Sequence, residues 1–258
     1  MALRLRTLLG DHGCTAALKS GAIKSDIVAF DFADYSPTNK GFKPMVLLPC
    51  VVLARFQHPY ALYNARLGNL KPVDLNGKRV GIRSFTTTTG AWLRGILAND
   101  YGVDLNSIDW VTFEDAHVAE FEDHSKRAPA GKKIVQMLLD GELDCVLGEK
   151  SDRPGLKPLF ADAEREEKAW FAKHGVVPIN HMIVVGRELA STKPQIVREV
   201  FRLLKESAAT AGTASPQFTL EEMRRSLQLI VHYSAQQGLI PRAYPVNELF
   251  DDLTRTLF

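Results

Sequence analysis

Residues 78–92 read Lys78-Arg79-Val80-Gly81-Ile82-Arg83-Ser84-Phe85-Thr86-Thr87-Thr88-Thr89-Gly90-Ala91-Trp92, and they predict a short strand, a hydroxyl-rich turn and the start of an amphipathic helix. The first turn of a helix offers unpaired backbone N–H groups and positive dipole potential, which favour a bound anion. The guanidinium of Arg83 is suited to a carboxylate or a phosphate. Two interpretations stay open here: an anion site, or a helix capped by one threonine with the other hydroxyls in water.

The elements around this segment alternate between strands and helices. Strands are expected within residues 1–11, 27–32, 45–53, 60–64, 79–83, 109–113, 143–147 and 183–185. Helices are expected over residues 88–100 and 130–139, and in the periodic segments around 197–204 and 220–230. This alternation predicts an α/β fold with largely parallel sheets. Breaks in the pattern at residues 70–74 and 178–180 suggest crossings between two lobes.

The composition is that of an ordinary globular protein of 258 residues, 45% hydrophobic and 24% charged, with a net charge of +2. Lysine and arginine are dispersed, so no nucleic-acid partner is expected, and no apolar run reaches membrane-spanning length. The N-terminus resembles a strand more than a signal peptide, which predicts a cytoplasmic protein. Three widely spaced cysteines (Cys14, Cys50 and Cys145) are expected to be reduced thiols, with redox catalysis as the alternative.

Several further segments resemble one enzyme family. The run Asp74-Leu75-Asn76-Gly77-Lys78-Arg79-Val80-Gly81 resembles the opening of the second lobe in type II periplasmic-binding-protein folds. Similarity to the 4,5-dihydroxyphthalate decarboxylases, an enzyme branch of that superfamily, extends over residues 81–97, 110–120 (WVTFEDAHVAE), 127–133 (RAPAGKK), 178–182 (PINHM), 237–242 (QGLIPR) and 247–250 (NELF). The resemblance implies a two-lobed, type II periplasmic-binding-protein-like α/β clamshell with a cleft between the lobes. We expect lobe one over residues 1–72 and 180–258, and lobe two over residues 73–179.

One departure from the family pattern follows Met45. Family members usually carry a further strand and helix before the position of Leu48-Pro49, whereas here Met45 runs almost directly into that segment. A parallel crossover needs a dozen or more residues, and none are available. Either the protein lacks part of lobe one, or a stretch is missing from the sequence. Since that stretch contributes acidic and hydroxyl residues in the family, the site inferred from sequence is expected to be incomplete.

The resemblance implies conversion of 4,5-dihydroxyphthalate to protocatechuate and carbon dioxide, a lyase reaction of phthalate and other aromatic-compound degradation. Each carboxylate is para to a hydroxyl, so protonating the ring carbon that bears it gives a ketone-like intermediate that accepts the electrons of the breaking bond. The protein must bind a dianion, deliver a proton to carbon and exclude water. No organic cofactor is required, and the chain has no Gly-rich nucleotide motif and no HExxH or paired CxxC motif. We therefore expect neither a cofactor nor a metal.

The same resemblance suggests which residues bind the substrate. From lobe two, the carboxylates would be held by Arg83, Ser84, Thr86, Thr87 and Thr88. From lobe one, Arg55 and His58 would meet the substrate, and His58 is a further candidate for the catalytic proton donor. The alternatives are a surface ion pair for Arg55 and an ordinary loop position for His58.

Glu114 and His117 follow a predicted strand, at the end where α/β folds usually bind ligands. An imidazole can donate a proton to carbon, and a carboxylate can orient it or take the phenolic proton. The alternative is that an acidic residue caps a following helix and His117 lies on its surface. His181 is expected to face the hinge, as a hydrogen-bond donor to a ring hydroxyl, a second candidate acid or a core histidine. Glu149, after another strand, is a further candidate carboxylate.

The principal alternative function is a non-catalytic binding protein for a small carboxylated solute, because the same fold serves transport and catalysis. A third reading is a related lyase that acts on another carboxylated aromatic. The expected partner is a small aromatic carboxylate, without nucleic acid or membrane, and the sequence leaves a homo-oligomer open.

Overall fold

The structure, a computed structural model, describes residues 2–33, 44–117, 121–212 and 220–257. Its strands are β1 (Leu3–Leu8), β2 (Val28–Ala33), β3 (Met45–Ala54), β4 (Ala61–Asn64), β5 (Arg79–Ile82), β6 (Asp109–Thr112), β7 (Lys126–Arg127), β8 (Cys145–Leu147), β9 (Leu156–Pro158) and β10 (Ile179–Gly186). Its helices are α1 (Ala16–Lys19), α2 (Thr88–Tyr101), α3 (Ile134–Leu139), α4 (Ala163–His174), α5 (Arg187–Thr192), α6 (Pro194–Thr210) and α7 (Leu220–Gln236). The chain divides into two compact units: unit 1 holds residues 1–54, 179–224 and 244–258, and unit 2 holds residues 55–178 and 225–243.

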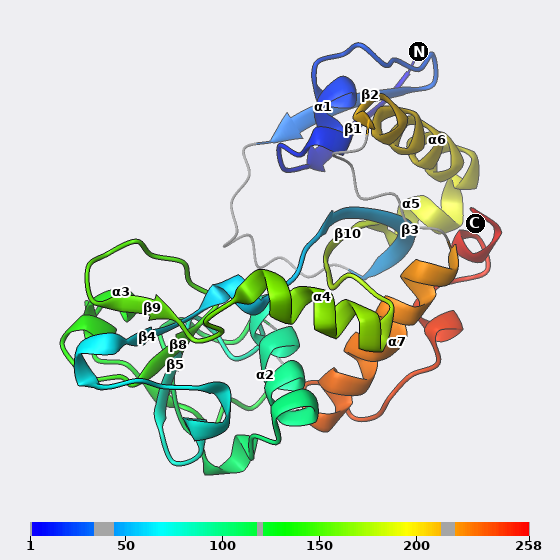
Figure 1. Ribbon diagram of the computed structural model, residues 1–258. Coiled ribbons are helices and arrows are strands. Elements are labelled where there is room, and N and C mark those ends of the chain that lie inside the picture. The colour runs from blue at the N-terminus through cyan, green and yellow to red at the C-terminus, as the bar shows by residue number, and fades with distance from the viewer. Residues whose placement is uncertain (1, 34–43, 118–120, 213–219, 258) are drawn as a thin grey trace. The chain divides into compact units, whose positions relative to one another are not determined.

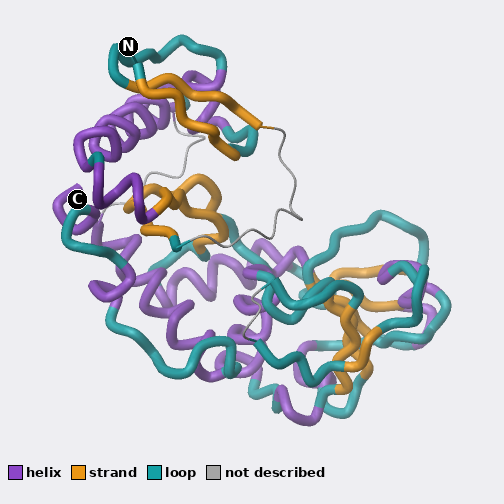
Figure 2. Tube along the Cα trace, turned by 180° about the vertical axis from the view of Figure 1, so that it is seen from behind, coloured by secondary structure: helices purple, strands orange, loops and turns teal. Residues whose placement is uncertain are grey.

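Unit 2 is built on a six-stranded sheet in the order β7-β6-β5-β8-β4-β9. The first four of these strands are parallel, while β4 runs antiparallel to β8 and to β9. Figure 1 shows the labelled strands of this sheet together, with α2 next to them, and Figure 2 shows the same strands in orange from behind. The register pairs Ile82 with Thr112 on one side and with Leu147 on the other. The carboxyl ends of β5, β6 and β8 therefore share one edge of the sheet.

Helix α2 is the most deeply buried helix-forming segment of unit 2. It begins after the N-cap Thr87 and ends at Gly102, whose left-handed φ of 66° suits glycine. All residues from Gly90 to Leu97 are buried. The sequence predicts one buried apolar face for this helix, but in the structure this part of the helix is buried on all sides. A Cβ on Gly95 would lie 2.1 Å from the Tyr233 ring, which shows how closely α7 approaches α2. Glycine is therefore required at this contact.

Unit 1 contains two smaller sheets and the helices that cover them. β1 and β2 pair in parallel, whereas β3 and β10 pair antiparallel. Its core contains Leu48 from β3 together with Val197, Val200, Leu203 and Leu204 from α6. The predicted apolar periodicity of residues 197–204 is therefore the buried face of α6.

The structure and the sequence predictions differ in several respects. The sheets are mixed rather than largely parallel, and α4 was not predicted. Its sequence is mostly charged, and only Trp170 is buried, although Asp162 before it and Gly175 after it are typical helix ends. Residues 55–72 and 225–243, which the sequence prediction assigns to lobe one, are grouped with unit 2. The reasons are that β4 pairs with β8 and β9, and that Tyr233 of α7 packs on Trp92.

All three cysteines are free thiols. Burial raises the pKa of Cys50 to about 12 and raises that of Cys145 as well. Since the thiolate is the reactive form, these environments disfavour the alternative of thiol redox catalysis.

Within the described ranges, no helix combines the length and the apolar character needed to cross a membrane. The same residues bring no three His, Cys, Asp or Glu side chains together in a group that could hold a metal ion.

Candidate active site at the strand ends of unit 2

The candidate site starts where β5 and β6 end side by side. Because Ile82 and Thr112 are register partners, the residues after them leave the sheet together. The main-chain carbonyl of Arg83 accepts hydrogen bonds from the N–H groups of Phe113 at 3.0 Å and Glu114 at 2.8 Å. The two loops are thus joined by their backbones before any side chain is considered.

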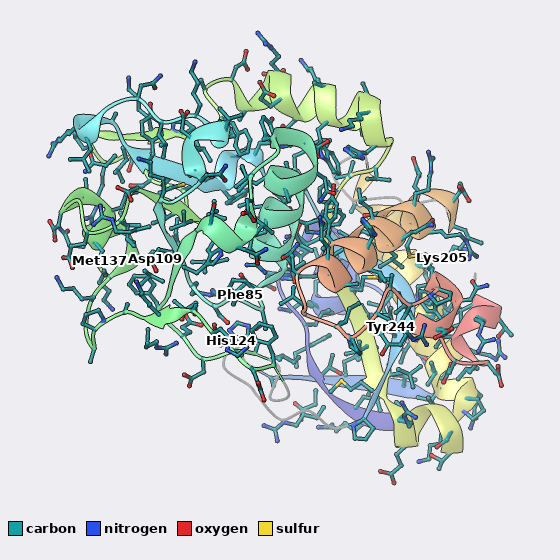
Figure 3. All side chains as sticks on the ribbon, turned by 90° about the horizontal axis from the view of Figure 1, so that it is seen from below. Phe85, Asp109, His124, Met137, Lys205 and Tyr244 are labelled. Atoms are coloured by element: carbon teal, nitrogen blue, oxygen red, sulfur yellow. The ribbon has the colours of Figure 1, made fainter. Side chains whose placement is uncertain are left out.

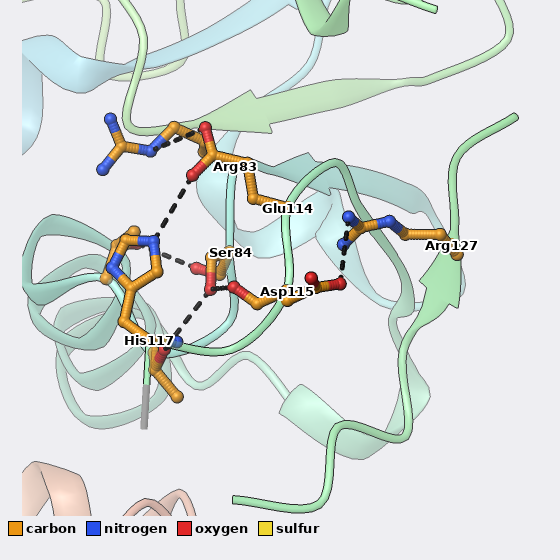
Figure 4. Close-up of polar contacts among 8 residues, drawn as sticks. Arg83, Ser84, Glu114, Asp115, His117 and Arg127 are labelled. Carbon is orange, nitrogen blue, oxygen red and sulfur yellow. Dashed lines mark hydrogen bonds and ion pairs between the residues drawn. The ribbon is translucent and has the colours of Figure 1, made fainter. Parts of the chain in front are cut away.

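Three predicted residues meet at this point (Figure 4). Arg83 Nε lies 3.6 Å from Glu114 Oε1, and His117 Nε2 lies 3.3 Å from Glu114 Oε2. The side chains are 48%, 45% and 29% exposed for Arg83, Glu114 and His117, so all three remain accessible. The two Nη atoms of Arg83 point away from Glu114 (Figure 4). The tertiary structure therefore brings an arginine, a carboxylate and a histidine together, and the two Nη atoms of the arginine are directed away from the carboxylate that contacts its Nε.

The hydroxyls of the turn mostly hold the two loops together. Ser84, which is fully buried, donates from Oγ to the Asp115 carbonyl at 3.0 Å. Thr86 Oγ1 accepts the backbone N–H of His117 at 2.7 Å. These bonds fix the main chain on both sides of Glu114, so Ser84 and Thr86 position the site in this structure.

The start of α2 distinguishes the two interpretations of the threonine run. Thr87 occupies the N-cap position, but its hydroxyl donates to the Ser84 carbonyl at 3.0 Å and makes no capping bond. Thr88 is the first helical residue and is partly exposed. The capping interpretation is therefore wrong for the Thr87 side chain, and the N–H groups of the first turn are not satisfied by it.

Asp115 forms an ion pair with Arg127. Its carboxylate lies 3.3 Å from Arg127 Nη2, and Arg127 reaches it from β7, whose register pairs Arg127 with Thr112 (Figure 4). Arg127 was not among the residues predicted for the site. Its only indication in the sequence was its place in residues 127–133, one of the segments that resemble the family.

Glu149 lies at the same edge, two residues beyond β8. Burial is the main cause that raises the pKa of the Glu149 carboxyl; the Glu114 charge acts in the same direction and the Arg83 charge opposes it. The Glu149 carboxyl is half-buried, and the charges of both Arg83 and Glu114 act on it. Glu149 is therefore part of the same cluster of charged side chains as Arg83, Glu114 and His117.

Arg55 was predicted to meet the substrate from lobe one. In the structure it belongs to unit 2, the same unit as Arg83. Its Nη1 donates to the Tyr60 hydroxyl at 2.6 Å, and its guanidinium carbon lies 3.9 Å from the Tyr60 ring centroid. It forms no ion pair within the described ranges, so the alternative of a surface ion pair does not describe it. The strand that follows Tyr60, β4, adjoins β8, which brings Arg55 to the same sheet edge as Glu149.

His58 is a core residue. It is completely buried, with its ring 4.9 Å from Phe160 and 6.3 Å from Trp170 between centroids. Burial lowers the pKa of its imidazole to about 4, although the charges of Glu166 and Asp100 oppose the shift. Neither the predicted catalytic position nor an ordinary exposed loop position describes this side chain.

His181 lies in β10 of unit 1, where it is exposed. Its ring meets that of His12 edge to face, 6.3 Å apart between centroids. It is therefore not a core histidine, and its predicted role at a site with Arg83 stays a prediction.

A separate hollow of about 1100 Å³ lies on unit 2 beside Phe85. Its aromatic wall includes Phe85, Trp110 and Phe121, and its charged lining is mainly acidic, with Asp104, Asp109, Glu122 and Asp123. Phe85 and His124 from this lining are labelled in Figure 3. None of the predicted site residues lines it, and its acidic character does not suit a dicarboxylate.

Two curated proteins similar to this chain are both called 4,5-dihydroxyphthalate decarboxylase. The protein from Comamonas testosteroni is 30% identical over 204 residues, which cover 73% of this chain and 62% of that protein. The protein from Pseudomonas putida is 25% identical over 162 residues, covering 57% of this chain and 63% of that protein. The chain thus spans less than two thirds of the length of these relatives, and no family model matches it. The predicted resemblance to these enzymes is confirmed.

Solved structures show the fold. The periplasmic aliphatic sulphonate binding protein SsuA from Escherichia coli aligns with a TM-score of 0.56 at 10% identity, covering 96% of this chain and 97% of that one. The alkanesulfonate-binding protein SsuA from Xanthomonas axonopodis pv. citri aligns at 0.53 and 12%, covering 97% and 98%. The desulfurization enzyme DSZB aligns at 0.54 and 11%, covering 98% of both chains. The predicted two-lobed, binding-protein-like fold is confirmed, and it is shared by binding proteins and an enzyme.

Proposed function

We propose that this chain removes one carboxylate from a dihydroxylated aromatic dicarboxylate, converting 4,5-dihydroxyphthalate to protocatechuate and carbon dioxide. The observation that carries the proposal is the meeting of Arg83, Glu114 and His117 at two neighbouring strand ends. The names of the two curated relatives supply the reaction and the substrate class.

Arg83 is suited to bind a substrate carboxylate. Its Nε contacts Glu114, while its two Nη atoms form the planar fork that binds a carboxylate in a bidentate manner. The nearby start of α2 adds positive potential from its first-turn N–H groups. Binding here would keep the reacting ring next to His117.

His117 and Glu114 would supply the proton. The contact of His117 Nε2 with the Glu114 carboxylate orients the imidazole ring and leaves Nδ1–H for the substrate. Transfer of that proton forms the C–H bond at the ring carbon that bears the carboxylate, while the para oxygen becomes ketone-like. The C–C bond then breaks, its electron pair restores the aromatic ring, and carbon dioxide leaves. His117 regains a proton from solvent, so the reaction consumes one proton per turnover.

The test is product formation by purified, chelator-treated protein incubated with 4,5-dihydroxyphthalate. We expect equal amounts of protocatechuate and carbon dioxide, measured by liquid chromatography and by gas analysis. Folded protein that binds the substrate and returns it unchanged contradicts the proposal.

That contradicting result is what the second candidate function predicts. The fold shared with two sulfonate-binding proteins is also suited to a non-catalytic receptor for a small anion. For a receptor, calorimetry would detect binding, and chromatography would recover only the original ligand.

A further inference from the structure

The aromatic ring of Tyr60 holds two cations at once. The guanidinium carbon of Arg55 lies 3.9 Å from the ring centroid, and Lys150 Nζ lies 4.4 Å from it. Arg55 also donates from Nη1 to the Tyr60 hydroxyl at 2.6 Å. The side chains come from segments far apart in the sequence, so the tertiary structure creates this pair.

Among the described residues, no carboxylate forms an ion pair with either cation. Burial raises the pKa of the Glu167 carboxyl, and the charge of Lys150 opposes that rise from farther away. Arg55 Nε is buried and has no hydrogen-bond partner among the described residues. Two neighbouring like charges repel, and an unpartnered buried donor is costly, so a bound anion would relieve both.

The cation pair lies along the same sheet edge as the candidate active site. The N–H of Gly148 donates to the Tyr60 carbonyl at 2.6 Å, which joins the end of β8 to the start of β4. On its other side β8 is the parallel partner of β5, which leads into Arg83. Glu149, which interacts with Arg83, directly precedes Lys150. Lys150 therefore follows the strand next to β5, and Arg55 precedes β4, the second strand along the same edge.

We propose that Arg55 and Lys150, held together on Tyr60, form a second carboxylate subsite beside Arg83. This inference rests on the proposed function, because it assigns the two carboxylates of an aromatic dicarboxylate to two neighbouring cationic groups. It deepens that function by making Lys150 a specificity-determining residue: the pair selects ligands with two adjacent carboxylates over ligands with one.

Binding of phthalate and benzoate, compared by isothermal titration calorimetry, tests the subsite without any turnover. Phthalate has adjacent carboxylates but no para hydroxyl to act as the electron sink, so it is a non-reacting probe. We expect phthalate to bind more tightly than benzoate. Lys150→Met should weaken phthalate binding roughly tenfold, as for loss of a charge-assisted hydrogen bond, and benzoate binding much less.

Lys157→Met is the matched control, since Lys157 is an exposed lysine in β9 of the same sheet. Arg55→Lys, which keeps the charge but not the planar fork, should also lower the preference for phthalate. Circular dichroism checks that each variant is folded. The subsite is overturned if the wild-type protein binds phthalate no more tightly than benzoate, or if Lys150→Met weakens both ligands equally or neither.

The two proposals fail separately. Absence of carbon dioxide release from 4,5-dihydroxyphthalate would reject the decarboxylation while the phthalate preference and its loss in Lys150→Met still support the subsite. Turnover with an unchanged preference in Lys150→Met would reject the subsite alone.

Discussion

Arg83 and Glu114 are joined twice: the carbonyl of Arg83 accepts the N–H of Glu114 at 2.8 Å, and Arg83 Nε lies 3.6 Å from Glu114 Oε1. The backbone bond fixes the spacing of the two loops, and the side-chain contact orients the guanidinium. Because both side chains are nearly half exposed, the contact itself adds little to folding stability. Its consequence is a fixed orientation of the Arg83 guanidinium relative to the Glu114 carboxylate.

Arg83→Ala should chiefly weaken substrate binding. The loss of a bidentate partner is expected to raise KM by a factor of at least about ten, with a much smaller change in kcat. Steady-state kinetics with 4,5-dihydroxyphthalate measures both parameters. Arg153→Ala, at an exposed arginine elsewhere in unit 2, is the control and should change neither. An unchanged KM in Arg83→Ala contradicts the binding role.

His117→Ala should chiefly slow the chemical step. Loss of a general acid typically lowers kcat by a factor of about 100 to 10,000. The backbone N–H of His117 still bonds to Thr86 in this variant, so the loop should keep its conformation. His232→Ala, at an exposed histidine of α7, is the control. Single-turnover kinetics at saturating substrate provides the measurement, and wild-type rates in His117→Ala would exclude the histidine as the proton donor.

Glu149→Gln should stabilise the protein near neutral pH. Folding raises the pKa of this carboxyl, so its contribution to stability is fully present below the unfolded-state pKa and is lost as the pH rises through the folded-state pKa. Glutamine does not ionise and avoids this loss. Thermal unfolding should show a higher Tm for the variant at pH 7 and a smaller difference at pH 4. A difference that grows toward acid would contradict the assigned cause.

His58 should make the fold sensitive to acid. Folding lowers the pKa of this imidazole to about 4. The contribution of His58 to the free energy of unfolding is therefore fully present above the ordinary pKa of 6.5 and is lost as the pH falls from 6.5 to 4. The loss at pH 4 is on the order of 3 kcal/mol. Urea unfolding of His58→Phe should lack this part of the pH dependence, whereas His232→Gln should retain it. Parallel pH profiles for His58→Phe and the wild type would contradict the prediction.

Gly95→Ala should destabilise unit 2 despite the higher helix propensity of alanine. Its Cβ would come within 2.1 Å of the Tyr233 ring, and overpacking of this kind costs about 1–3 kcal/mol. Denaturant unfolding measures the loss. In the double variant with Tyr233→Leu, the glycine substitution should cost less, because the clashing ring is gone. Strict additivity of the two changes would show that the contact is not the cause.

The local sequence was sufficient to predict the strand–turn–helix around Arg83, the neighbouring strand before Glu114, and the α/β class. These features depend on apolar alternation, turn residues and helix periodicity, which act between residues close in the chain. The same local reasoning missed α4, because a charged surface helix with one buried tryptophan has almost no apolar pattern. The family resemblance came from short segments and needed no folding information.

Contacts between distant segments could not be predicted in this way. Parallel strand register brings Glu114 to Arg83, and the β4–β8 pairing brings Lys150 to Tyr60. Packing on Phe160 and Trp170 made His58 a core residue, although its sequence context suggested a loop or a site. The physical reason is that register and burial depend on the whole core, whereas propensity depends on neighbours in the chain. Residue types, local elements and, through the resemblance, the assignment of Arg83, Glu114 and His117 to one site were therefore readable from the chain. The contacts among these residues, and the meeting of Arg55 with Lys150 at Tyr60, required the folded protein.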